Sequence, residues 1–187
     1  KKNNAWLLYT LTGRLLDHTA WSDISALQDV IVFRSGKKVF IAPRDQLGKS
    51  ADGNPLRLSE PFDEIKQWPQ GLLWGRAGEF QGVLNQSLHG VIRFDKHNLI
   101  QTFFGAVAEV PNGYTLFNWD GKRSTAFERV HVFDPWVAVK KSGSWLLLDP
   151  RLMTYQSRAY DTLRAEGPFP TGVIADSAFV HFAQNHV

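Results

Sequence analysis

The chain contains no cysteine among its 187 residues. Disulfide bonds and thiolate-ligated metal sites are therefore excluded. It also has no run of about 18 apolar residues, the length that a membrane-spanning helix requires. The net charge is only +3, from 21 basic and 18 acidic residues. Because the basic residues are scattered, mostly as pairs such as Lys37-Lys38, the sequence predicts neither a nucleic-acid partner nor a membrane span.

Apolar material is plentiful. Hydrophobic residues make up 43% of the chain and aromatic residues 13%, which is enough for a packed core. The length suits a single domain over residues 1–187. Because the chain starts at Lys1 and not at Met, we expect a processed protein or a part of a longer one.

A four-residue pattern, aromatic-polar-x-apolar, recurs along the chain, and we call its aromatic residue the anchor. Successive anchors lie 41, 32, 33 and 33 residues apart, and the first of these steps contains the polar insertion GKSADGNP, which we interpret as a loop. Such regular recurrence predicts a repeat protein. The anchors are Trp21, Phe62, Phe94, Phe127 and Tyr160.

Glycine-containing turns recur in phase with the anchors and are flanked by short runs rich in β-branched and aromatic residues. Such runs predict antiparallel strands joined by tight hairpins, in which glycine supplies positive φ. The sequence therefore predicts an all-β fold with roughly three antiparallel strands per unit of about 33 residues. No helical period extends over three turns, although Asp23–Asp29 and Thr154–Ala165 could each hold a short helix or turn. The predicted turns are Ser35-Gly36, Ala77-Gly78, Asn112-Gly113 and Ser142-Gly143, with second hairpin turns at Leu11-Thr12-Gly13, His89-Gly90 and Asp120-Gly121.

About five such units would have to stack to bury their apolar faces. We place them near residues 5–37, 38–79, 80–112, 113–143 and 144–187. Three strands per unit favour an open superhelical array, with a propeller-like arrangement as the alternative, since propeller blades usually have four strands and about 40 residues.

Four segments carry a resemblance to a known family: WLLYTLTGRLL (6–16), GVLNQSLHGVI (82–92), YTLFNWDGK (114–122) and WLLLDPRLMTY (145–155). Together with the anchors they resemble the WG (KWG) repeat of bacterial proteins, over about residues 5–165. The literal Trp-Gly pair occurs once, at Trp74-Gly75. The resemblance implies a non-catalytic binding or scaffolding module without a cofactor, usually bacterial, with an exported, periplasmic or cell-envelope location slightly favoured.

The sequence evidence for a catalytic or metal site is weaker than the evidence for the repeat. His181 and His186 are five residues apart with no third ligand nearby, so they do not predict a metal site. The carboxylates beside the anchors recur with the repeat, and we interpret them as fixing turns by bonding to backbone N–H groups. An enzyme whose site uses His97 and His131 remains a less favoured hypothesis.

Tryptophans supply the candidate binding residues. Trp6, Trp21, Trp136 and Trp145 occupy strand or anchor positions and are expected in the core. Trp68 and Trp119 are expected at exposed loop tips, where a tryptophan can contact a protein or a sugar ring. The predicted function is protein binding or scaffolding, and the alternative is binding of a carbohydrate or cell-envelope polymer. The predicted binding residues are Trp68, Trp119, Asp120 and Lys122.

Overall fold

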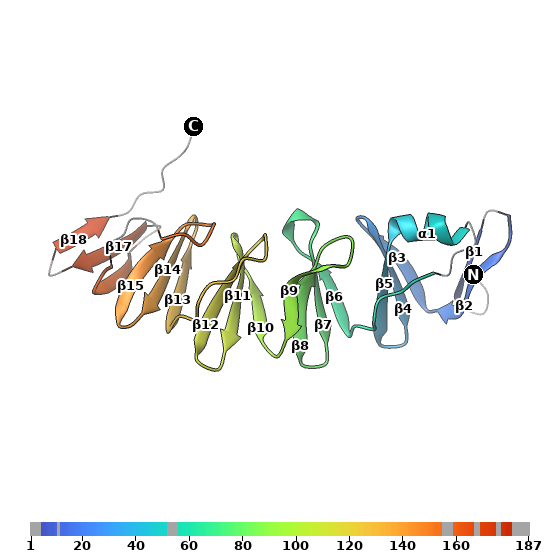
Figure 1. Cartoon of the computed structure of the whole chain (residues 1–187), viewed down its shortest axis with the longest axis horizontal. Coiled ribbons are helices and arrows are strands. Elements are labelled where there is room, and N and C mark those ends of the chain that lie inside the picture. The colour runs from blue at the N-terminus through green and yellow to red at the C-terminus, as the bar shows by residue number, and fades with distance from the viewer. Residues whose placement is uncertain are drawn as a thin grey trace, which may run out of the picture. The chain divides into compact units, whose positions relative to one another are not determined.

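The strands form a series of small antiparallel sheets, each built from strands that are consecutive in the chain (Figure 1). The computed structural model describes residues 5–10, 12–51, 56–154, 159–166, 169–174 and 177–180. Within these residues the chain is all-β apart from one α-helix and one 3-10 turn, which confirms the predicted fold class.

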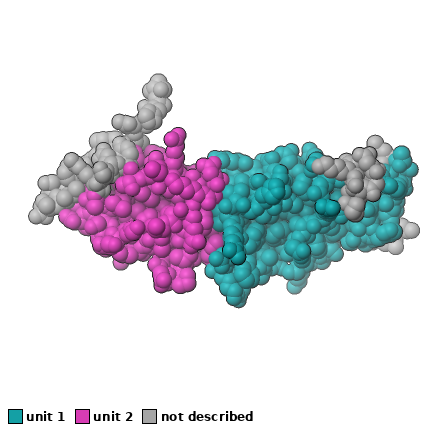
Figure 2. Space-filling view, viewed as in Figure 1, with its two compact units in different colours: residues 1–96 teal, residues 97–187 magenta. Residues whose placement is uncertain are grey.

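The chain divides into two compact units, residues 1–96 and 97–187 (Figure 2). The first unit contains the sheets β1-β2, β3-β4-β5 and β6-β7-β8-β9. Its elements are β1 (Trp6–Tyr9), β2 (Leu15–Trp21), β3 (Asp23–Leu27), β4 (Val30–Ser35), β5 (Lys38–Pro43), α1 (Arg44–Ala51), β6 (Glu64–Gln67), η1 (Pro69–Gly71), β7 (Leu73–Ala77), β8 (Phe80–Leu84) and β9 (Gly90–Asp95).

The second unit contains three sheets of three strands each, β10-β11-β12, β13-β14-β15 and β16-β17-β18. Its elements are β10 (Asn98–Gln101), β11 (Gly105–Val110), β12 (Gly113–Asn118), β13 (Arg129–Phe133), β14 (Trp136–Lys141), β15 (Ser144–Leu148), β16 (Thr162–Glu166), β17 (Phe169–Ile174) and β18 (Ser177–Val180).

The tight turns predicted from glycine lie where expected. Gly36, Gly78, Gly113 and Gly143 all have positive φ, and each lies at the turn between the second and third strands of its sheet or at the start of that third strand. At Ser142-Gly143 both residues have positive φ, 50° and 83°, as a two-residue hairpin with the right-handed strand twist requires.

The anchors are the residues at which the chain passes from one sheet to the next. Phe62 exchanges two backbone hydrogen bonds with Val39 of β5, both 2.8 Å, while the following N–H, of Asp63, donates to Arg76 O of β7 at 2.8 Å. Phe127 with Tyr114, and Tyr160 with Trp145, repeat this arrangement. At these three positions the anchor is thus bonded to the third strand of one sheet, and the residue after it to the second strand of the next.

The segments leading to the anchors act as a fourth strand. Ser59 Oγ accepts a hydrogen bond from Ile41 N at 3.0 Å, and Ser124 Oγ accepts one from Leu116 N at 2.9 Å. Ser59 and Ser124 each lie three residues before their anchors, Phe62 and Phe127. In both segments a serine hydroxyl, three residues before the anchor, therefore takes the place of the backbone carbonyl that would accept the hydrogen bond from the third strand.

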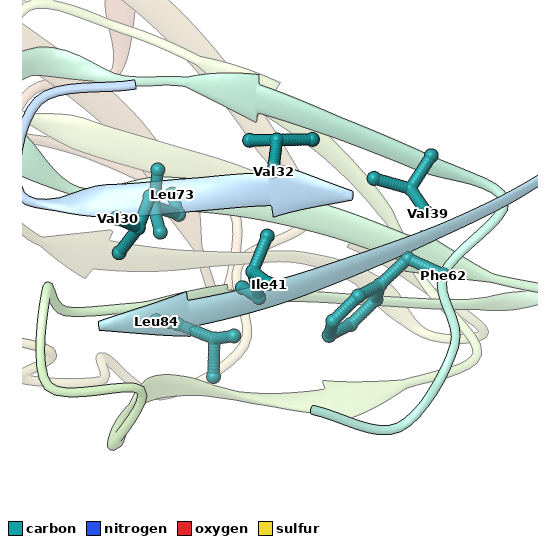
Figure 3. Packing of buried hydrophobic residues seen from close by; sticks show 7 residues of the cluster. All are labelled: Val30, Val32, Val39, Ile41, Phe62, Leu73 and Leu84. Carbon is teal, nitrogen blue, oxygen red and sulfur yellow. The ribbon is translucent and has the colours of Figure 1, made fainter. Parts of the chain in front are cut away.

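The cores lie between the faces of successive sheets. Between β3–β5 and β6–β9 the buried side chains include those that Figure 3 shows gathered together, Val30, Val32, Val39, Ile41, Phe62, Leu73 and Leu84. The expectation of a buried tryptophan is confirmed at Trp21, Trp136 and Trp145 but is wrong at Trp6, whose exposed fraction is 41%.

Helical predictions from the sequence fail in both directions. Asp23–Leu27 and Thr162–Glu166, where a short helix was considered, are strands β3 and β16. The polar insertion predicted as a loop instead begins with the last residues of α1, and residues 52–55 lie outside the described chain. Helix α1 takes the place of the turn that follows β8, β12 and β15.

Candidate functional site

The predicted binding residues lie in turns, each at the corresponding end of its own sheet. In a meander of antiparallel strands, the turn between the first two strands and the turn after the third lie at the same end. Trp68 lies in a turn of the first kind, between β6 and β7, and Trp119 to Lys122 form a turn of the second kind, after β12.

The turn after β12 is held by the side chain of Asn118. Its Oδ1 accepts hydrogen bonds from the backbone N–H groups of Asp120 at 3.1 Å and Lys122 at 2.8 Å. Gly121, at φ 78°, supplies the left-handed residue, and Asn118 N donates to Lys122 O at 3.1 Å. Asn118 is itself buried, so the cage of bonds that presents this turn is rigid.

The same cage recurs in two other turns, and there glycine is absent. Asn85 Oδ1 accepts from Ser87 N and His89 N, and Asp149 Oδ1 from Arg151 N and Met153 N, all at 2.9–3.0 Å.

The left-handed residues of these turns are Leu88, at φ 63°, and Leu152, at φ 60°. The predicted turn at His89-Gly90 is therefore displaced toward the N-terminus, and Gly90 begins strand β9. The predicted turn at Leu11-Thr12-Gly13 is closed by Thr10 Oγ1, which accepts from Arg14 N at 2.9 Å, although Leu11 itself lies outside the described residues.

Trp119 is half-buried, and its indole Nε1 donates to the backbone carbonyl of Phe103 at 3.0 Å. Phe103 lies in the turn between β10 and β11, so this bond ties together two turns of one sheet. Asp120 and Lys122 are exposed. The Lys122 ammonium donates to Met153 Sδ, 3.3 Å away in the turn after β15, and 55% of Met153 is exposed.

These contacts bring the turns 118–122 and 149–153 side by side within the second unit. We call this pair of turns the turn surface. It exposes one acidic side chain, Asp120, one basic side chain, Lys122, and one apolar side chain, Met153, on two loops that are held by internal hydrogen bonds.

Trp68 does not lie on an exposed loop tip, and that expectation is wrong. Its exposed fraction is 6%. The chain turns back after it, because Trp68 N donates to Leu72 O at 2.8 Å across the 3-10 turn η1. The indole is thereby buried in the first unit.

The first unit has a polar pocket that sequence reasoning did not indicate. Its volume is about 460 Å³. Its lining includes the side chains of two aspartates and one arginine. No residue predicted to bind a partner lines it. Its lining residues are Asp29, Pro43, Arg44, Asp45, Gln86 and Ser87.

Carboxylates beside the anchors bond to backbone N–H groups of hairpin turns, as expected from the sequence. Asp63 accepts hydrogen bonds from the Lys38 ammonium and from Gly78 N, each at 2.6 Å, and these two donors hold the Asp63 pKa below its usual value. Glu128 accepts from Gly143 N at 3.4 Å, in the corresponding hairpin turn. The pKa of Glu64 is also lowered, first by the Lys66 ammonium and then by Arg76.

The histidines of the enzyme hypothesis lie against aromatic rings. The centroid of the His131 ring is 5.2 Å from that of Trp145, and His97 contacts Phe117 edge-on at 6.2 Å. Among the described residues, no three histidine or carboxylate side chains converge as metal ligands. His181 and His186 lie outside the described residues.

No protein-family model matches the sequence, and no curated protein matches it. Solved structures show only weak likeness. One is KlHsv2 with its loop 6CD replaced by a Gly-Ser linker, with 10% identity, a TM-score of 0.35, and coverage of 78% of this chain and 55% of that one.

Another is PorZ, a bacterial surface component of the type-IX secretion system of Porphyromonas gingivalis. Its identity to this chain is 10% and the TM-score is 0.34, over 87% of this chain and 26% of that one. The chain thus spans at most about half the length of these structures.

Proposed function

We propose that this protein is a non-catalytic binding or scaffolding module that recognises another protein through the turn surface. The observation that carries the proposal is the juxtaposition of two caged turns, joined by the contact of Lys122 with Met153. A loop whose backbone is already fixed loses little conformational entropy on binding. Methionine is enriched at protein–protein interfaces, and exposed charged groups suit their polar rim, so Met153 with Asp120 and Lys122 beside it supports a protein surface as partner.

The proposal includes the repeat architecture. We infer about five units of the WG type, each near 33 residues, in an open array or a propeller-like arrangement. The recurrence of the anchor hydrogen bonds at Phe62, Phe127 and Tyr160 supports a common unit. Within the described residues, no helix has the length and hydropathy that crossing a bilayer would need.

The carbohydrate alternative is less well supported. It uses Trp68, Trp119 and other exposed aromatic residues as platforms on which sugar rings could stack. Trp68 is buried, and the indole of Trp119 is held to the carbonyl of Phe103. The observed contacts therefore favour a protein partner over a glycan.

The test is an affinity capture with matched charge variants. The chain would be immobilised and exposed to lysate and envelope extract of its source organism, beside Asp120→Ala/Lys122→Ala and a control, Glu79→Ala/Lys96→Ala. The control removes an exposed ion pair of 2.9 Å in the first unit, so both variants lose one acid and one base.

We expect one discrete protein to be retained by the native chain and the control but lost by the Asp120/Lys122 variant. Equal retention by all three, or recovery of glycan without protein, would contradict the proposal.

A further inference from the structure

Strand β13 is the first strand of its sheet and has a neighbour on one side only. It pairs with β14 from Arg129 opposite Lys140 to Phe133 opposite Trp136, and it stands at one end of the sheet order β13-β14-β15 (Figure 1). Residues 126–136 are all described, and within the described chain no second strand or segment pairs with β13. Its outer row of N–H and C=O groups is therefore a template for pairing with another chain.

The residue two after the anchor is charged in three sheets, and in each it lies directly opposite a charged residue of the second strand. In β3 and β6 this residue is an acid and the opposite residue is an arginine, so an ion pair forms. The ion pairs are Asp23–Arg34, at 3.8 Å, and Glu64–Arg76, at 3.4 Å, between a carboxylate oxygen and a guanidinium nitrogen. In β13 the same position is Arg129, and the residue opposite is Lys140. Two cations therefore meet where the two sheets of the first unit have an acid and a base.

No acid offsets this pair of cations. Side chains directly opposite in antiparallel strands have Cβ atoms about 4.5–5.5 Å apart, and like charges there are destabilising. Among the described residues, neither Arg129 nor Lys140 forms an ion pair with a carboxylate. The nearest acids in the sequence are Glu128, which accepts a hydrogen bond from Gly143 N, and Asp134, in the turn beyond β13. An anionic group from outside the sheet would offset this repulsion.

The two faces of β13 differ in chemistry. Alternate side chains of a strand point to opposite faces. Arg129 and His131 share one face, where the centroid of the His131 ring is 5.2 Å from that of Trp145. Val130 and Val132 share the other face, and Val132 is 43% exposed. The open edge of β13 thus has a basic face and an apolar face.

We propose that the open edge of β13 binds an extended acidic segment of another protein, which is added to the sheet as a further strand. The segment would alternate carboxylates, beside Arg129 and His131, with β-branched apolar residues, beside Val130 and Val132. Main-chain hydrogen bonds give such strand addition its affinity, and the side chains give its specificity. This edge is a different surface from the turn surface, so the two proposals can fail separately.

The charge on the edge selects its occupant. Charged side chains on an edge strand protect it against pairing with other chains. Because Arg129 and Lys140 are both positive, this protection acts against a basic strand, while an acidic strand is attracted. A second copy of this chain would bring its own Arg129 and His131 to the same edge, so β13 favours an acidic partner over itself.

The probe is the hexapeptide Thr-Glu-Val-Glu-Val-Thr, labelled at its N-terminus with an uncharged fluorophore, and the readout is fluorescence anisotropy with the intact chain. Two control peptides separate charge from strand pairing. The first, Thr-Lys-Val-Lys-Val-Thr, reverses the charge. The second carries N-methyl groups on its two central residues, whose N–H groups point to opposite sides of a strand, so that one of them faces β13 in either orientation.

The chain variant is Arg129→Glu, which recreates opposite Lys140 the acid–base pair seen at Glu64 and Arg76. We expect it to melt no lower than the native chain and to bind the acidic peptide at least about tenfold more weakly. Arg93→Glu is the matched control, because Arg93 is an exposed arginine of β9 in the first unit and the change in net charge is the same. It should bind the peptide as the native chain does.

The β13 site is supported if the acidic peptide alone binds saturably and only Arg129→Glu weakens it. No saturation up to about 1 mM peptide, equal binding of either control peptide, or equal weakening in Arg129→Glu and Arg93→Glu would refute it. A melting temperature of Arg129→Glu below that of the native chain would contradict the repulsion between Arg129 and Lys140.

A native dimer in analytical ultracentrifugation that Arg129→Glu dissociates would also refute the proposal, because a second copy would then occupy the edge. If capture that depends on Asp120 and Lys122 persists while the peptide fails to bind, the turn surface stands and the β13 site does not.

Discussion

Replacing Asn118 with alanine tests whether one side chain builds the turn surface. The change removes the acceptor of two backbone N–H groups, at 3.1 and 2.8 Å. Each such hydrogen bond contributes about 0.5–1.5 kcal/mol, so the free energy of unfolding should fall by about 1–3 kcal/mol. A loss near 2 kcal/mol would lower the melting temperature by about 4–8 °C in a chain of this size.

The matched variant is Asn118→Asp, which keeps the acceptor oxygen. Asp149 makes the same pair of bonds in the turn after β15, so an aspartate can close this cage. Asn118→Asp alone would replace the bond from Asn118 Nδ2 to Asp120 Oδ2, 3.3 Å, by a contact between two carboxylates. It is therefore combined with Asp120→Asn, which restores a donor to that contact, and the pair should cost less than about 1 kcal/mol.

Urea unfolding followed by circular dichroism would measure both variants against the native chain. The reasoning fails if Asn118→Ala is as stable as the native chain, or if Asn118→Asp/Asp120→Asn is destabilised as much as Asn118→Ala.

Two further predictions concern the hairpin turns. Gly143→Val should lower the free energy of unfolding by about 1–2 kcal/mol, because φ is 83° there and a β-branched residue is strained in that region. The control is Gly90→Ala, which has open space around it and no positive φ, and it should leave stability unchanged. Thermal denaturation would measure both variants. Asp63→Asn should destabilise at neutral pH, since the lowered pKa of Asp63 means that the Lys38 and Gly78 contacts favour the ionised form. The stabilisation by ionised Asp63 is fully present above the pKa of the unfolded chain, near about 4, and is lost as the pH falls through the lower pKa of the folded chain. The urea midpoints of the native and Asp63→Asn chains should therefore converge in acid. Midpoints that stayed apart in acid would refute the argument.

Most of the strand framework could be predicted from the sequence. Glycines at positions of positive φ, such as Gly143, mark the hairpin turns. The apolar runs beside them predict strands to within about one residue of their observed bounds, as in β14 and β15. The anchors were visible because one aromatic position is shared by two sheets, which leaves little freedom for substitution.

Glycine does not mark every one of the caged turns, so glycine alone does not predict them. Leu88 and Leu152 take positive φ without it, and the detectable signal is the Asn or Asp three residues earlier, at Asn85 and Asp149. Helix α1 is too short, at eight residues, for a periodic pattern to identify it.

The burial of Trp68 could not be read from its Pro- and Gly-containing neighbours. Those residues predict a turn but not the direction in which the preceding side chain points. In this case the chain folds back through Leu72 and encloses the indole.

The anchors make the boundary between two sheets one residue wide. The N–H of Phe62 is bonded to β5 and the N–H of Asp63 to β7. Adjacent amides therefore report on the opening of different sheets, and hydrogen exchange at such a pair would show whether neighbouring sheets unfold together or one at a time. A molecule joined in this way can transmit the loss of one sheet to its neighbour through a single peptide unit, in addition to the side-chain core that lies between the two sheets.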